Sequence, residues 1–237
     1  MVVRAVLFDF GETLAREVRH DIKRVHRFVV KELQQRGYTI SWRKWKRAIG
    51  WAINKLRELR RKQLRDVRFE ELYGWALERL GIPLLQDLLE EAHQVYVETY
   101  GYELVEGVRG LLKELANRYQ LGVVSNAISR IPRAVLDKEG LLPLFETVVI
   151  SGEVGWLKPH PRIFHEALRR LRVRAREAVF VGDSIDTDVV GAKNVGMLAV
   201  WVCHRGVADL VYGNPDAIIT QLSSLPEVLC QLERRFS

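Results

Sequence analysis

Short apolar runs without polar alternation recur along the chain and predict buried strands. The first occupies residues 2–8, is rich in β-branched side chains and ends at Asp9. Similar runs lie at 121–124, 147–150, 178–181 and 197–202, with a weaker one at 217–219. Strands that are apolar on both faces are typical of a parallel sheet that is covered by helices on each side.

Helical periodicity lies between these runs. Val108, Leu111 and Leu115 share one face of a predicted helix, and Ile163 and Leu171 share a face of another. Strands that alternate with helices favour an α/β fold with a doubly wound parallel sheet.

Residues 15–102 interrupt this alternation. They contain no convincing strand and show amphipathic helical patterns, with breaks at Gly37, Gly50, Gly81 and Gly101. We therefore expect an inserted α-helical domain at 15–102, and an α/β core built from 1–14 and 103–237.

Polar residues follow the predicted strands where each strand ends. Asp9 follows the first, Ser125 the second and Asp183 the fourth, with Asp188 and Lys158 nearby in the sequence. Ligands bind beyond the carboxyl ends of strands in open parallel sheets, so these groups are expected to converge. Each residue alone is ordinarily a turn, a helix cap or a solvated lysine, but their joint occurrence in order argues against that interpretation.

This set of groups suits phosphate chemistry. Carboxylates on adjacent strand ends form a hard oxygen site for Mg²⁺, and a carboxylate can also attack phosphorus or carbon to give a covalent intermediate. Ser125, at the start of a predicted helix, can hold phosphate oxygens together with backbone N–H groups. Lys158 can neutralise charge that develops in the transition state.

Four segments resemble the motifs of the haloacid dehalogenase-like superfamily, in their order and spacing. They are residues 6–14 around Asp9, residues 123–126 with Ser125 and Asn126, residues 158–164 with Lys158-Pro159, and residues 181–192 with Gly182-Asp183. The resemblance covers residues 1–14 and about 103–205. Any one motif is weak evidence, whereas four together indicate the fold.

The resemblance implies a Rossmann-like core, an aspartyl intermediate at Asp9, and Mg²⁺ held by Asp9, the backbone carbonyl of Gly11 and Asp183. Asp188 would be a further ligand or would support one, while Ser125, Asn126 and Lys158 would bind the substrate. The segment 15–102 resembles the helical cap that closes over the core, excludes water and selects the substrate.

The pattern breaks at Gly11, where phosphatases of this superfamily usually carry a second Asp as general acid and base. Such help is worth roughly 10²–10⁴-fold in rate. Glu12 is the first candidate substitute, and Glu17 or His20 from the cap is the alternative. A further alternative is that the reaction needs no acid there, as in members that cleave carbon–halogen bonds.

Three functions therefore stay open. The favoured one is a Mg²⁺-dependent phosphatase that acts on a small phosphorylated metabolite. A 2-haloacid dehalogenase-type hydrolase is the second, favoured by Gly11 and by Ser125-Asn126, but Asp183 is an acid where dehalogenases carry a neutral residue. A weakly active or binding protein is the third.

Charge adds one further feature. The net charge is +7, which favours anionic partners, and ten basic residues lie within 43–65 with Glu58 as the one acid. We interpret this stretch as the solvated face of an amphipathic cap helix. Attraction of anionic substrates and binding of nucleic acid are the alternatives, and no recognised nucleic-acid motif accompanies the stretch.

The remaining features predict location and assembly. The apolar run at the start is too short for a signal peptide, no apolar run reaches the length of a membrane span, and two cysteines form no disulfide framework. We therefore expect a cytoplasmic protein that does not contact a membrane, as a monomer or homodimer.

Overall fold

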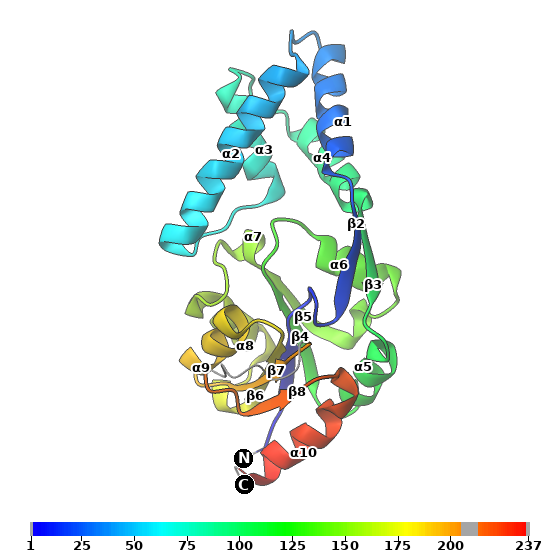
Figure 1. The fold of residues 1–237 in the computed structure, drawn as a ribbon, viewed down its shortest axis with the longest axis vertical. Coiled ribbons are helices and arrows are strands. Elements are labelled where there is room, and N and C mark those ends of the chain that lie inside the picture. Colours follow the sequence, from blue (N-terminus) through cyan, green and yellow to red (C-terminus); the bar gives the residue numbers. More distant parts are fainter. Residues whose placement is uncertain (1, 205–212, 236–237) are drawn as a thin grey trace.

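A parallel six-stranded sheet forms the lower half of the molecule (Figure 1). The computed structural model describes residues 2–204 and 213–235, so parts of the predicted core segment 103–237 lie outside the described residues. The strands follow the order β5-β4-β1-β6-β7-β8. Their bounds are β1 Ala5–Phe8, β4 Gln120–Ser125, β5 Phe145–Ile150, β6 Ala178–Gly182, β7 Leu198–Val202 and β8 Ala217–Ile219. The predicted α/β fold class is confirmed.

Helices cover both faces of this sheet. Val6 and Phe8 of β1 pack on the face that carries α5 (Val108–Ala116) and α10 (Leu225–Arg235). Ala5 and Leu7 pack on the other face, with α8 (Pro161–Leu171) and α9 (Val190–Asn194). Alternate residues of one strand thus enter opposite apolar layers, which explains the unbroken apolar run in the sequence. The shorter helices α6 (Ile131–Lys138) and α7 (Ser151–Val154) follow β4 and β5.

Four helices form a second body above the sheet, which we call the helical region (residues 22–99; Figure 1). They are α1 Ile22–Gln35, α2 Trp42–Gln63, α3 Phe69–Arg79 and α4 Gln86–Thr99. Their apolar faces meet in a core of their own around Trp45, Phe69 and Tyr73. Ser41 caps α2 by accepting a hydrogen bond from the backbone of Lys44. No helix among the described residues is long and apolar enough to cross a membrane.

A two-stranded antiparallel sheet joins the helical region to the core. It pairs β2 (Ala15–His20) with β3 (Tyr100–Leu104). The expectation that 15–102 contains no strand is therefore wrong at both ends of that segment. Five of the six residues of β2 are exposed, so the strand has no apolar alternation to reveal it, and pairing with a distant strand creates it.

The connection between α2 and α3 makes a second contact with the core. The backbone N–H of Phe69 donates to Ile128, that of Asp66 donates to Gly155, and that of Leu157 donates to Leu64. Gly152 permits this approach, because a Cβ there would lie 2.6 Å from the carbonyl oxygen of Val67. The helical region is thus held over the ends of the strands from two sides.

Candidate functional site

Asp9 lies directly after β1 at the centre of the sheet, and its side chain is almost fully buried. Its backbone N–H donates to the carbonyl of Val181, which extends the pairing of β1 with β6 by one residue. Ser125 ends the neighbouring strand β4 and is 5% exposed, and Asp183 follows β6. The structure thus brings together the groups that the sequence places at three adjacent strand ends.

Lys158 is the cation at the centre of this group. Its Nζ donates to Asp9 Oδ1 at 2.5 Å and lies 2.7 Å from Asp188 Oδ1, with only 3% of the residue exposed. Asn126 fixes the backbone of Lys158, because its Oδ1 accepts from Lys158 N–H at 2.8 Å and its Nδ2 donates to Lys158 O at 3.2 Å. Asn126 therefore ties the loop after β4 to the segment that carries the lysine.

Asp188 is held by the turn that follows β6. Its Oδ2 accepts from the backbone N–H of Ser184 at 3.1 Å, and Thr187 Oγ1 donates to its Oδ1 at 3.3 Å. A Cβ at Gly182 would lie 2.3 Å from Asp188 Oδ2. Glycine is thus required at the end of β6 for this carboxylate to reach its position.

Three carboxylates of the site can share one cation. Asp9, Asp183 and Asp188 each place one oxygen within 4.8 Å of the others. Gly11, whose carbonyl was predicted as a ligand, lines the same cavity. A hard, oxygen-rich donor set of this kind fits Mg²⁺, and the mutual repulsion of the carboxylates would be offset by the ion.

Burial and charge shift the proton affinities in this site. Burial raises the pKa of Asp9 to about 7; Lys158 acts in the opposite direction, and Asp188 adds to the rise. Burial and the charge of Asp188 also raise the pKa of Asp183. Burial alone would lower the pKa of Lys158, but the charges of Asp188 and Asp9 raise it, so the lysine stays protonated.

A cavity of about 490 Å³ opens in front of these residues, between the core and the helical region. Asp9, Ser125, Asn126 and Lys158 form its floor. Its other walls come from β2 and β3 and from the helical region, and include Glu17, His26, Arg60, Tyr73, Tyr100 and Tyr102.

The basic stretch 43–65 has one member in this cavity. Nine of its ten cations lie on α2, and Arg60 alone among the ten lines the cavity beside Asp9. The buried Asp66 accepts from both Nε and Nη2 of Arg60, at 3.0 and 2.8 Å, and so fixes its guanidinium. The apolar side of α2, including Trp45, Ile49 and Leu56, is buried in the helical region, as the amphipathic pattern predicts.

Glu12 lies outside this cavity. Its side chain is 55% exposed and its Oε2 lies 3.9 Å from Arg16 Nε. The residue has φ 55°, and its carbonyl oxygen lies 2.6 Å from His204 Nε2. The structure therefore does not bring Glu12 to Asp9, although it brings Glu17 into the cavity wall. The sequence did not single out His26 or the tyrosines, because they belong to no motif, and it offered Arg60 only as one of the ten cations of the basic stretch.

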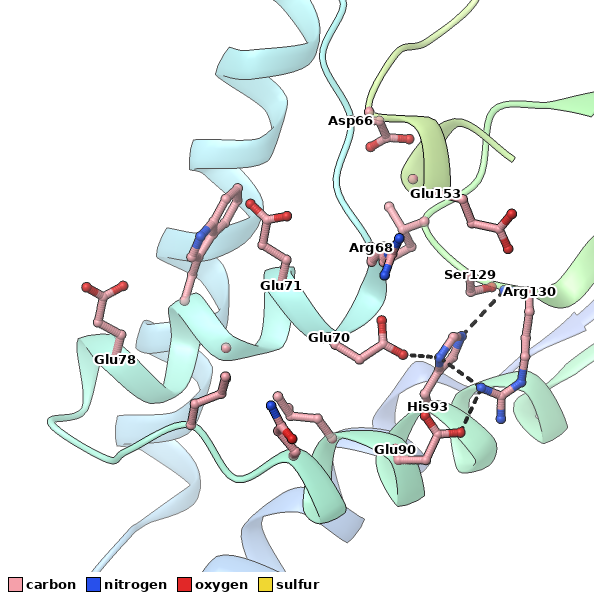
Figure 2. A pocket seen from close by; sticks show the side chains of 18 of the residues that line it. Asp66, Arg68, Glu70, Glu71, Glu78, Glu90, His93, Ser129, Arg130 and Glu153 are labelled. Carbon is pink, nitrogen blue, oxygen red and sulfur yellow. Dashed lines mark hydrogen bonds and ion pairs between the residues drawn. The ribbon is translucent and has the colours of Figure 1, made fainter. Parts of the chain in front are cut away.

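A second, larger cavity of about 1680 Å³ lies between α3, α4 and the loops of the core (Figure 2). Glu70, Glu90 and His93 form a second group with ligand-type atoms within 4.8 Å of one another. Arg130, from the loop after β4, reaches into that group: its Nη1 lies 3.0 Å from Glu90 Oε1 and 3.2 Å from His93 Nδ1. None of the predicted site residues lines this cavity.

Comparison with known proteins gives consistent matches. A family model for haloacid dehalogenase-like hydrolases matches residues 3–196. A glyceraldehyde 3-phosphate phosphatase of Pyrococcus furiosus is 40% identical over 139 residues, which cover 55% of this chain and 56% of that enzyme. The chain thus spans about half the length of that relative. A phosphatase of the same name from Pyrococcus abyssi is 29% identical over 208 residues, covering 84% of this chain and 81% of the relative.

Solved structures agree with the family match. A crystal structure described as a 2-haloacid dehalogenase of Pseudomonas syringae aligns with a TM-score of 0.72 and 26% identity. That alignment covers 98% of this chain and 100% of the other.

Proposed function

The chain belongs to the haloacid dehalogenase-like hydrolases, and on that premise we propose that it is a Mg²⁺-dependent phosphatase of small phosphorylated metabolites. The observation that carries the proposal is the position of Asp9. It is buried at the end of the central strand, bonded to Lys158, and faces a cavity shared with Ser125. The curated relatives named as glyceraldehyde 3-phosphate phosphatases support a small phosphate ester as substrate.

Asp9 acts as the nucleophile in this proposal. One carboxylate oxygen attacks phosphorus, the bond between phosphorus and the ester oxygen breaks, and an aspartyl phosphate results. Lys158 keeps the carboxylate oriented through its 2.5 Å bond and offsets the charge of the phosphoryl oxygens. Ser125 donates its hydroxyl to a phosphoryl oxygen. Water then cleaves the aspartyl phosphate and releases inorganic phosphate.

Asp9, Gly11 and Asp183 would hold the magnesium ion, with Asp188 beside them. When bound, Mg²⁺ supplies positive charge that lets an anionic phosphate approach the carboxylates. The protein's own share is to hold three acids within reach of one ion and to keep Lys158 protonated between two of them.

We propose that the helical region, with β2 and β3, is a cap that corresponds to residues 15–102. It supplies most of the apolar wall of the cavity, and 490 Å³ suits a small molecule. Arg60 adds one cation to that wall and supports recognition of an anionic substrate rather than of nucleic acid. Cytoplasmic location and a monomeric or homodimeric state stay predictions from the sequence.

Hydrolysis of p-nitrophenyl phosphate with and without Mg²⁺ tests the proposal. Mg²⁺-dependent turnover that is lost in Asp9→Asn is the expected result. Turnover no greater than that of Asp9→Asn, over a wide range of pH and temperature, would contradict it.

A second candidate is hydrolysis of a carbon–halogen bond. Gly11 favours it, since a halide leaves without a proton, and so does the likeness to the structure described as a 2-haloacid dehalogenase. Asp9 would attack carbon and expel halide, and water would then cleave the ester. Halide release from 2-chloropropionate without added metal, in the absence of phosphatase activity, would favour this candidate.

A further inference from the structure

Position 11 has space for an acidic side chain, but the residue there is glycine. A Cβ added to Gly11 would meet no atom within 4 Å, and Gly11 lines the cavity, so there is open space for a side chain at this position. Among the described residues that line this cavity, the carboxylates are Asp9, Asp183, Asp188 and Glu17. The first three form the metal-type cluster, which leaves Glu17 as the one acid outside it.

The register of β2 and β3 places Glu17 in the wall of the cavity, where its side chain is 41% exposed and open to solvent. Glu17 lies opposite Tyr102, and both line the cavity. The next pair along the sheet, Arg16 opposite Glu103, projects to the other face, as the alternation of a strand requires. Tyr102 packs against Phe10, the residue after Asp9, with ring centroids 5.4 Å apart. Glu17 is therefore the cross-strand neighbour of Tyr102, and Tyr102 packs on the residue that directly follows the nucleophile.

The groups that surround Glu17 cannot easily replace it. Burial, and then the charge of Glu17, raise the pKa of Tyr102, and burial likewise raises that of Tyr100, so both phenols keep their protons. His20 Nδ1 lies 3.5 Å from Glu17 Oε1, and its ring stacks on Tyr100 at 4.2 Å, but His20 does not line the cavity. His26 lines it with its ring packed against Tyr73 and Trp45.

We propose that Glu17 is the general acid and base of the reaction, in place of the acid absent at Gly11; this rests on the proposed phosphatase function. Protonated Glu17 gives its proton to the ester oxygen as the bond to phosphorus breaks, so the leaving group departs as an alcohol. The Glu17 carboxylate then takes a proton from the water that attacks the aspartyl phosphate. Inorganic phosphate is released, and Asp9 and protonated Glu17 are restored.

The test uses two phosphate esters whose leaving groups differ in basicity. kcat/KM reports the phosphorylation of Asp9, and the full chain is assayed with Mg²⁺ on p-nitrophenyl phosphate and on glycerol phosphate. In Glu17→Gln, kcat/KM for glycerol phosphate should fall roughly 100-fold or more, because an alkoxide needs the proton. kcat/KM for p-nitrophenyl phosphate should change by less than about fivefold, because nitrophenolate leaves without one.

Two further variants make the result specific. Glu103→Gln removes a carboxylate from the opposite face of the same small sheet and should leave both kcat/KM values near those of the parent. Gly11→Asp, added to Glu17→Gln, places an acid in the open space at position 11 and should restore turnover of glycerol phosphate.

The ratio of the two kcat/KM values decides the role of Glu17. We divide kcat/KM for p-nitrophenyl phosphate by kcat/KM for glycerol phosphate. A rise of this ratio by roughly tenfold or more in Glu17→Gln, relative to the parent, supports the role of Glu17, and a smaller change overturns it. Failure of the phosphatase proposal itself looks different: the parent chain would then cleave neither ester faster than Asp9→Asn does, and Glu17 would have no reaction to serve.

Discussion

Two clusters of acidic side chains in this protein meet the same geometric condition for holding a metal, yet they are built differently. Asp9, Asp183 and Asp188 stand at the ends of strands, with Lys158 between two of them. Glu70, Glu90 and His93 stand on α3 and α4, with Arg130 beside them (Figure 2).

The difference lies in burial and in what the cation does. The Asp9 and Asp188 side chains are 12% and 1% exposed, whereas Glu90 is 65% exposed. Arg130 comes from the core and also donates to Gln94 at 2.9 Å, so it joins the core to the helical region. His93 and Glu70 pair with each other between α4 and α3, within the helical region, with Nδ1 and Oε1 2.5 Å apart.

Closeness of acidic groups therefore does not define a catalytic site. In the first cluster, the strand ends hold carboxylates whose burial costs free energy, and a bound ligand can offset that cost. In the second, Arg130 already pairs with Glu90 across the interface, and His93 pairs with Glu70 within the helical region. The predictions that follow separate the two clusters, beginning with the largest effect.

Substitution of the nucleophile should give the largest difference in activity between the two clusters. Asp9→Asn should lower p-nitrophenyl phosphate turnover by roughly 10³-fold or more, because an amide cannot form the aspartyl phosphate. Glu70→Gln is the matched change in the second cluster and should alter turnover by less than about threefold. Steady-state assays of both variants check this, and comparable losses would show that the clusters are not functionally distinct.

Removal of each cation should have unequal effects on stability. Lys158→Met removes the cation that is shared by the buried carboxylates of Asp9 and Asp188 and should lower the free energy of unfolding by about 3–5 kcal/mol. Arg130→Met removes a partly exposed cation and should cost about 1 kcal/mol. Urea unfolding of both variants without Mg²⁺ measures the two losses. Equal losses would contradict the view that only the first cluster is electrostatically costly.

Mg²⁺ should stabilise the protein by binding at the first cluster, Asp9, Asp183 and Asp188, and not at the second. Mg²⁺ at a concentration near 100 times its dissociation constant should raise the free energy of unfolding by about 2.7 kcal/mol. Asp183→Asn should remove most of this effect, whereas Glu90→Gln should preserve it. Thermal unfolding across a Mg²⁺ titration checks the prediction. A Mg²⁺ effect that is lost in Glu90→Gln and kept in Asp183→Asn would place the ion in the second cluster and contradict the prediction.

The smallest effect concerns the histidine of each cavity. Burial lowers the pKa of His26 from 6.5 to about 4, and its buried Nδ1 has no partner among the described residues, whereas His93 is paired with Glu70. Between pH 6.5 and 4 the unfolded chain therefore binds the extra proton, and stability falls as pH falls. With allowance for the solvent contact of His26, the loss is about 1–2 kcal/mol.

His26→Phe keeps an aromatic ring in the same packing and should remove this part of the pH dependence. Free energies of unfolding at pH 7 and pH 4.5 provide the measurement for parent and variant. An unchanged difference between the two pH values would assign the acid sensitivity to other groups.

The sequence by itself determined the parallel sheet and the groups at its edge. Apolar runs without alternation can be buried only between two layers of helices, and strands that all point one way bring Asp9, Ser125 and Asp183 to one edge. The helices of residues 22–99 were equally legible, because each carries an apolar face.

Tertiary structure alone decided which side chains face the nucleophile. β2 is a strand only because β3 pairs with it from about 80 residues away, and that pairing places Glu17 at the rim of the cavity, which Glu12 does not line. Arg60 reaches the cavity, while its basic neighbours on α2 do not, because the buried Asp66 holds it. Such choices depend on contacts between distant segments, which no local pattern of polar and apolar residues encodes.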